Sequence, residues 1–336
     1  MGRAVSARAP SNAPWHKLPC PPGTAGKADH LPPPKLLPDN NLLAHHGPLL
    51  AGPSLGGAVV EELLKRRASV RALVRKEPQD GKVLQGVEIA YGDLIDPPSI
   101  LKSLNGIDKM FLLIGNVADE FTQAVTAYGL ARRVGVKHIT YLSVLQADRF
   151  LDVPHFASKA AIEQTIKNHD VSFTILRPGY FMQNDARLKD QLIGPGLYPM
   201  PLGNTGIAAV DVRDIAEAAA ISLTQNGHAG KTYNLVSKNL LSGPNAAATW
   251  SGILQKEIRY TGHANFDAFE EQLRKTGTPS WLAYDLRVMY QAYVERGFAT
   301  SQEDVAQFAE LLGHEPRTYG NYARELAQQW VAISAA

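Results

Sequence analysis

The sequence predicts an α/β fold in which a doubly wound parallel sheet is followed by a smaller, mostly helical C-terminal lobe. From Ser69 onward, short β-branched or apolar runs alternate with amphipathic helical stretches, which is typical of a parallel sheet wrapped by helices. The final part of the chain shows mainly helical spacing. The chain can bury a full core, because its 336 residues are 45% hydrophobic and only 20% charged.

Strands are expected where apolar and β-branched residues cluster between polar turns. They cover residues 69–75, 87–93, 109–115, 138–144, 172–178 and 231–236. Helices are expected between them at 98–105, 121–135 and 157–169. A later helix is expected to begin at Ser301, with Asp304 as its capping partner, and to end near Gly313.

The first 48 residues differ from the rest. They contain the stretches "PCPPG" and "LPPPKLLP", in which proline fixes φ and removes backbone donors so often that neither a helix nor a central strand is expected. We therefore interpret residues 1–48 as a Pro-rich, disordered tail. Residues 49–225 are expected to form the sheet domain, and residues 226–336 a lobe packed on it.

Composition excludes several classes of protein. The net charge is +2 without any long Lys/Arg run, so neither nucleic acid nor a membrane surface is an expected partner. One cysteine, Cys20, cannot form an internal disulfide, and no apolar run approaches the roughly 20 residues of a membrane helix. A cytoplasmic location is expected. The ten histidines show no metal-ligand spacing, so no metal is expected.

The stretch "LAGPSLGGAVV" at residues 50–60 carries part of a dinucleotide-binding loop. A Rossmann fold needs glycines after its first strand for the tight turn, the approach to the pyrophosphate and the packing of the following helix. The candidates here are Gly52, Ser54, Leu55 and Gly56, whereas Pro53 offers no N–H to a phosphate. An ordinary loop before a helix explains the stretch equally well.

The residues after the expected strand at 69–75 favour a phosphorylated cofactor. An acidic residue usually ends this strand and bonds the ribose 2′-hydroxyl, whereas an arginine accommodates a 2′-phosphate. Here the strand ends in Arg75 and Lys76. NADP(H) is therefore expected in preference to NAD(H), the alternative being two solvated basic residues in a turn.

From Gly56 to Trp330 the chain resembles the NmrA-like group of atypical short-chain dehydrogenase/reductases. The resemblance is carried by "GGAVVEELL", "GDLIDPPSILKSLNGID", "HFASKAAIEQTI" and "FTILRPGYFMQN", with support from "DVRDIAEAAA" and "LLGHEPRTYGNYAREL". Such proteins begin almost directly with a strand that ends in a glycine-rich loop. This chain has the Pro-rich tail in that place, which leaves its first strand and its leading glycines unaccounted for.

The resemblance implies further contacts with the cofactor. It implies that Asp93 and Leu94 lie beside the adenine, and that Gly115 and Asn116 line the pyrophosphate or a ribose. Each has an alternative, since Asp93 is equally suited to a turn and Asn116 to a loop in which it bonds its own backbone.

The resemblance also places Ser143, His155 and Lys159 together. Short-chain reductases typically have a serine after the fifth strand and a Tyr-x-x-x-Lys pair on the next helix, with both side chains on one face. His155 stands in the place of the tyrosine, and an imidazole can donate a proton near neutral pH. Lys159 is expected to bond the nicotinamide ribose. The alternatives are a surface histidine and a solvated lysine.

Residues of the "RPGYFMQN" segment follow the sixth strand, where ligands lie beyond the carboxyl ends of strands. Tyr180, Phe181 and Asn184 are therefore candidates for the substrate side, unless the two aromatic residues belong to the core of the lobe. Asp211 and Asp214 fit helix-start acids better than catalytic groups.

Together these features predict an NADP(H)-dependent reductase of a small carbonyl, quinone or similar acceptor. One alternative is a non-catalytic NADP(H) sensor that regulates a protein partner, as implied by the resemblance to the NmrA regulator and favoured by the missing tyrosine at position 155. A second alternative is that the altered loop around Gly52 impairs cofactor binding.

Overall fold

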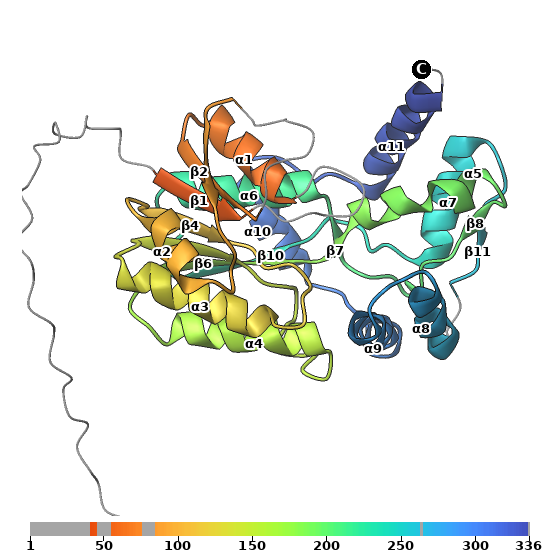
Figure 1. Cartoon of the computed structure of the whole chain (residues 1–336). Helices are drawn as coiled ribbons and strands as arrows, with labels where there is room; N and C mark the ends of the chain where they lie inside the picture. Colours follow the sequence, from red (N-terminus) through yellow and green to blue (C-terminus); the bar gives the residue numbers. More distant parts are fainter. Residues whose placement is uncertain (1–40, 46–54, 76–84, 263–264, 335–336) are drawn as a thin grey trace, which may run out of the picture. The chain divides into compact units, whose positions relative to one another are not determined.

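The computed structural model describes residues 41–45, 55–75, 85–262 and 265–334 (Figure 1). Residues Pro38–Ala336 belong to one compact unit. In the described part of the chain, no helix is both long enough and apolar enough to cross a lipid bilayer.

A seven-stranded parallel sheet forms the centre of the structure, in the order β3-β2-β1-β4-β5-β6-β10. Its strands are β1 (Asn41–His45), β2 (Ser69–Val74), β3 (Val87–Tyr91), β4 (Lys109–Leu112), β5 (His138–Leu142), β6 (Ser172–Pro178) and β10 (Lys231–Leu235). The chain moves outward from β1 to β3 and then returns to place β4 on the other side of β1. This reversal is the topological switch point of a Rossmann fold, beside which ligands bind at the carboxyl ends of the strands.

The strand β1 corrects the prediction that residues 1–48 form only a tail. Asn41–His45 pairs in parallel with β2 on one side and with β4 on the other, with Leu43 opposite Arg71 and Met110. The five residues contain no proline, so each retains the N–H that a central strand must donate. The prolines on both sides of this segment led to the prediction of a tail. The strand forms because it pairs with β2 and β4, which lie far along the chain.

Helices cover both faces of the sheet (Figure 1). One face is covered by α1 (Leu55–Lys65), α6 (Val212–Thr224) and α10 (Gln302–Leu312), and the other by α2 (Pro97–Leu104), α3 (Glu120–Arg133) and α4 (Pro154–Lys167). The predicted helices are confirmed with ends displaced by a few residues. The predicted start of α10 is also confirmed, since Ser301 and Asp304 form a capping box and Gly313 ends the helix at a φ of 77°.

The C-terminal lobe has its own aromatic core, which includes the fully buried Trp250, Tyr198 and Phe298. The Trp250 ring stacks on Trp330 with 5.1 Å between centroids. The elements of the lobe are β7 (Tyr180–Phe181), the 3-10 helix η1 (Met182–Leu188), α5 (Lys189–Ile193), β8 (Leu197–Tyr198), β9 (Ala209–Val210), α7 (Gly243–Leu254), β11 (Arg259–Tyr260), α8 (Phe266–Lys275), α9 (Ser280–Arg296) and α11 (Tyr319–Ser334).

The structure differs from the predicted division at residue 225. β10 adds the last strand to the main sheet beside β6, and α10 packs on β10 and α6. Conversely, β7, η1, α5 and β8 precede residue 225 and contribute to the lobe. The chain passes between the two parts more than once, which a single boundary in the sequence cannot represent.

Candidate functional site

The predicted cofactor residues lie at the carboxyl ends of neighbouring strands. Leu55 and Gly56 are buried in the first turn of α1, which follows β1, while Arg75 is exposed directly after β2. Gly115 and Asn116 are exposed after β4. Gly52, Ser54 and Lys76 lie outside the described residues. The described candidates thus border the switch point between β1 and β4 from three strands, as a dinucleotide site requires.

The loop after β3 holds Asp93 in a turn. The Asp93 carboxylate accepts a hydrogen bond from the Ile95 backbone N–H at 3.2 Å, and the Asp93 N–H donates to Ser99 Oγ at 3.0 Å. Leu94 is buried against the sheet at 4% exposure. Asp93 therefore has the local role of a turn acid, at the carboxyl end of β3.

Lys159 is not a solvated helix lysine. Its side chain is 8% exposed, and its Nζ donates to Glu120 Oε1 at 2.6 Å. The ammonium also lies 6.0 Å from the centroid of the buried Tyr141 ring. Burial, followed by the charge of Glu120, raises the Tyr141 pKa well above its ordinary value. Among the described residues, Glu120 Oε2 and the Tyr141 hydroxyl have no hydrogen-bond partner.

Ser143 contacts a second buried carboxylate on α4. Its Oγ donates to Glu163 Oε1 at 2.6 Å. The Arg177 guanidinium binds both oxygens of Glu163, at 2.8 and 2.6 Å, and Lys167 adds a bond of 3.0 Å. Burial opposes ionisation of Glu163, but the hydrogen bonds from Arg177 and Ser143 outweigh it, so its pKa lies below the usual range. Ser143 therefore connects the end of β5 to an ionised cluster.

His155 occupies the second position of α4 and contacts the lobe. Its ring Nδ1 lies 2.5 Å from Asp285 Oδ2, and its backbone N–H donates to Asp285 Oδ1 at 3.0 Å. Asp285, on α9, is 1% exposed. His155 and Lys159 lie one helical turn apart, and each is paired with a buried carboxylate from a different element.

The three predicted substrate residues take different positions. Tyr180 is 5% exposed, and its hydroxyl donates to the fully buried Asp185 carboxylate at 3.1 Å, so it belongs to the core of the lobe. Phe181, the last residue of β7, and Asn184, in η1, are half-buried. The preceding Gly179 is required by close packing, because a Cβ there would lie 2.6 Å from the Ala208 carbonyl oxygen.

The Asp185 carboxylate accepts hydrogen bonds from three tyrosine hydroxyls. Tyr180, Tyr198 and Tyr319 all donate to its carboxylate, and Trp250 Nε1 donates to the Tyr319 hydroxyl at 2.8 Å. Burial raises the Asp185 pKa, although the tyrosine hydrogen bonds favour its ionised form. This network ties Tyr180 of the "RPGYFMQN" segment to the buried core of the lobe.

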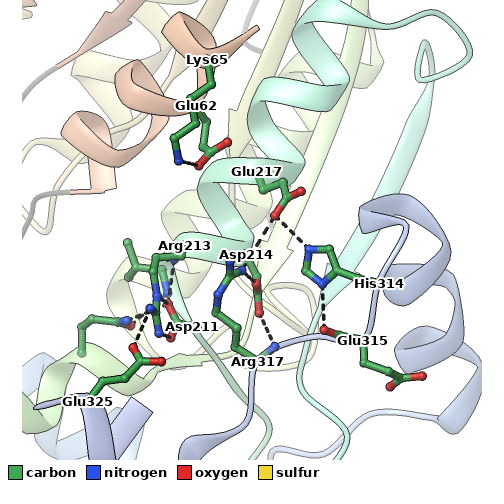
Figure 2. Close-up of polar contacts among 12 residues, drawn as sticks. Glu62, Lys65, Asp211, Arg213, Asp214, Glu217, His314, Glu315, Arg317 and Glu325 are labelled. Carbon is green, nitrogen blue, oxygen red and sulfur yellow. Dashed lines mark hydrogen bonds and ion pairs between the residues drawn. The ribbon is translucent and has the colours of Figure 1, made fainter. Parts of the chain in front are cut away.

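A different cluster contains three groups of metal-ligand type (Figure 2). Asp214, Glu217 and His314 each offer an atom within 4.8 Å of the others. However, the Arg317 guanidinium binds Asp214, and the Arg317 backbone N–H donates to the same carboxylate at 2.7 Å. His314 Nε2 lies 3.0 Å from Glu217 Oε2. The Arg317 guanidinium supplies the positive charge that a metal ion would otherwise provide. The cluster is therefore an ion-pair network that holds the segment before α11 against α6.

The two acids predicted at the start of α6 have separate partners. The Asp211 carboxylate accepts from the Arg213 N–H at 2.8 Å, which confirms Asp211 as the N-cap. Arg213 then binds Glu325 of α11 at 2.6 Å (Figure 2). Asp214 serves mainly as the partner of Arg317, a contact between residues 103 positions apart.

Sequence reasoning missed the partners of the predicted residues. Glu163 could have been found, because it follows Lys159 by one helical turn in "KAAIE" and therefore shares its face. Glu120 and Asp285 carry no local signal, because they lie 39 and 130 positions from their partners.

Comparison with known proteins places the whole arrangement in one family. The sequence profile described as the NmrA-like family matches residues 51–323. The chain is 26% identical over 272 residues to an NAD(P)H azoreductase of Xenophilus azovorans, covering 81% of this chain and 94% of the azoreductase. It is 26% identical over 275 residues to quinone oxidoreductase 2 of Escherichia coli strain K12, covering 79% and 92% respectively.

Two solved structures share the fold. An NADPH-dependent quinone oxidoreductase of Escherichia coli, complexed with NADPH, superposes with a TM-score of 0.74 at 24% identity, covering 85% of this chain and 99% of that one. A Citrobacter sp. triphenylmethane reductase complexed with NADP(H) gives a TM-score of 0.73 at 24% identity, with the same coverage.

Proposed function

The chain belongs to the NmrA-like family, and from this premise we propose that it is an NADP(H)-dependent reductase of a small quinone, azo, carbonyl or similar acceptor. The azoreductase and the quinone oxidoreductase to which it is similar support this class of reaction. The family alone does not select the acceptor, so the proposal rests on the side chains around the site.

The residues at the carboxyl edge of the sheet suit NADP(H). Arg75 offers a planar guanidinium after β2, where a 2′-phosphate would lie, and the sequence has Arg75 and Lys76 at the end of this strand instead of the acidic residue that selects an unphosphorylated ribose. The exposed Gly115 and Asn116 flank the other side of the switch point. When bound there, the cofactor supplies a hydride to the acceptor.

The observation that carries the proposal is the shared face of His155 and Lys159 at the start of α4. The Lys159 ammonium has three N–H donors, of which one is used by Glu120, so donors remain for the hydroxyls of a ribose. His155, one turn earlier, carries an ionisable ring at the lobe side of the same face. One group thus holds the nicotinamide nucleotide, and the other exchanges a proton with the acceptor.

The test combines cofactor titration with turnover. Calorimetry of the purified chain with NADPH and NADH is compared between wild type and Arg75→Ala, and NADPH oxidation is followed near ~340 nm, the absorbance of the reduced nicotinamide, against quinone and azo acceptors. Loss of a hydrogen bond to a charged group costs about 1.5–3 kcal/mol, so Arg75→Ala should weaken NADPH binding roughly 10- to 150-fold and NADH binding little.

Arg133→Ala is the matched control. Arg133 is another exposed arginine, but it ends α3 and therefore lies at the opposite, amino edge of the sheet. An unchanged ratio of NADPH to NADH affinity in Arg75→Ala would refute the role of Arg75. Tight NADPH binding without turnover of any acceptor would support the sensor instead of the reductase, and absence of binding would support the impaired loop.

A further inference from the structure

The lobe supplies a buried carboxylate to the helix that carries the proposed proton donor. Asp285 lies in the first half of α9 and is 1% exposed, while His155 lies at the start of α4, 130 positions earlier. Both oxygens of the carboxylate are used. Oδ1 accepts the His155 backbone N–H at 3.0 Å, and Oδ2 lies 2.5 Å from ring Nδ1.

This contact determines where the ring carries its hydrogen. An ionised carboxylate can only accept hydrogen bonds, so Nδ1 must be the nitrogen that donates to Asp285. The neutral ring therefore has its hydrogen on Nδ1, and the proton that the ring gains or loses is at Nε2. The two bonds together also fix the rotation of the ring relative to the backbone.

The position of His155 at a helix start gives the carboxylate a second effect. The first turn of a helix disfavours a positive charge, because the backbone N–H groups there point outward and the helix dipole is positive. Asp285 satisfies one of these N–H groups and places a negative charge beside the ring. The carboxylate therefore satisfies a backbone donor of the helix start as well as orienting the ring.

We propose that Asp285 is a positioning residue that holds His155 as the proton donor of the reductase. The inference rests on the proposed function. In the reaction with a quinone, the acceptor gains a hydride with its electron pair from NADPH, the Nε2–H bond of His155 breaks, and the proton forms an O–H bond on the reduced acceptor. Neutral His155 then regains a proton from solvent, and the products are the quinol and NADP⁺.

Through this contact, the lobe contributes a residue to the proposed active site. α4 belongs to the layer that covers the sheet, whereas α9 belongs to the lobe. His155 is held in the orientation of a proton donor only when the lobe places Asp285 against the start of α4.

The variant Asp285→Asn tests whether the carboxylate orients the His155 ring, because asparagine has nearly the same side-chain volume as aspartate. The backbone N–H of His155 can only donate, so the oxygen of the new amide must face it, and the NH₂ group must then face Nδ1. The ring would become an acceptor at Nδ1, and its hydrogen would move to Nε2. Long-range ¹H–¹⁵N correlation spectra of histidine-labelled protein report this change, with the His155 signals assigned from His155→Gln.

Kinetics on the same variants test the consequence. Proton transfer by a positioned group contributes roughly 10²- to 10⁴-fold, so Asp285→Asn should lower kcat at least about 10²-fold while the NADPH Kd stays within about twofold. Glu295→Gln is the matched control, because it makes the same chemical change at an exposed position of α9 and should leave kcat unchanged. The double variant Asp285→Asn/His155→Gln should be no slower than His155→Gln, because both residues act through one group.

The outcomes separate the two proposals. A ring that keeps its hydrogen on Nδ1 in Asp285→Asn, or an unchanged kcat despite a changed tautomer, overturns the positioning role. If Asp285→Asn does not fold, His155→Gln with full wild-type kcat overturns it as well. A wild-type protein without turnover overturns the reductase itself, whatever the spectra show.

Discussion

Replacement of Lys159 by methionine should destabilise the fold strongly, independently of any effect on the cofactor. The Lys159 and Glu120 side chains are 8% and 2% exposed, and one hydrogen bond of 2.6 Å joins them. The other carboxylate oxygen, Oε2, has no partner among the described residues. Removal of the ammonium would therefore leave a negative charge in the interior without the cation that compensates it.

The size of the effect follows from this burial. Removing one partner of a buried ion pair typically costs about 3–5 kcal/mol, whereas replacing both partners by apolar side chains of similar volume is often close to neutral. Lys159→Met should accordingly lower the free energy of unfolding by about 3–5 kcal/mol. The double variant Lys159→Met/Glu120→Met should lie within about 1 kcal/mol of wild type.

Equilibrium urea unfolding, followed by circular dichroism and tryptophan fluorescence, measures these differences. Lys102→Met is the control, because Lys102 is an exposed lysine on α2, and its loss should change stability by less than about 0.5 kcal/mol. The reasoning fails if Lys159→Met costs less than about 1 kcal/mol, or if the double variant is less stable than Lys159→Met. The measurement also defines the conditions under which activity of Lys159 variants can be compared.

Two further predictions concern other buried groups. Asp185→Asn should lower the free energy of unfolding by about 2–3 kcal/mol, because three tyrosine hydroxyls donate to the carboxylate and an amide NH₂ group cannot accept a hydrogen bond. A thermal unfolding midpoint equal to that of wild type would contradict this. Burial, with smaller effects of Lys109 and His228, lowers the His138 pKa from 6.5 to about 4. Between these two pH values the unfolded state binds more protons than the folded state. The free energy of unfolding should therefore fall as the pH falls from about 6.5 to about 4. His138→Gln should reduce this dependence in urea titrations, and identical slopes for the two proteins would exclude His138 as its source.

The sheet can be predicted from sequence wherever local pattern and final environment agree. The strand predicted at residues 172–178 has the same bounds in the structure, because a run of β-branched and apolar residues there ends in Pro178 and Gly179. β1 escapes prediction, because the composition around Asn41–His45 favours an irregular chain and only β2 and β4 make it a strand. Pairing over long distances decides this element.

The candidate site shows the same division. His155 and Lys159 can be found because their four-residue spacing matches the Tyr-x-x-x-Lys pattern of the family that the sequence resembles. Their partners Asp285 and Glu120 cannot, because each contact depends on how α9 and α3 pack against α4. The spacing in the sequence thus predicts which groups react, whereas tertiary packing determines the charges beside them.

The connection between β1 and α1 has a consequence for how this protein would bind its cofactor. Strand β1 ends at His45 and α1 begins at Leu55, and the intervening sequence "HGPLLAGPS" contains two prolines and two glycines. Each proline removes a backbone N–H of the kind that cradles a pyrophosphate in the usual glycine-rich turn. We therefore expect a larger share of the binding energy to come from side chains on neighbouring elements, above all from Arg75 after β2 and Lys159 on α4. On this reasoning, we expect both the selectivity for the phosphorylated cofactor and the affinity for it to depend on these two cations.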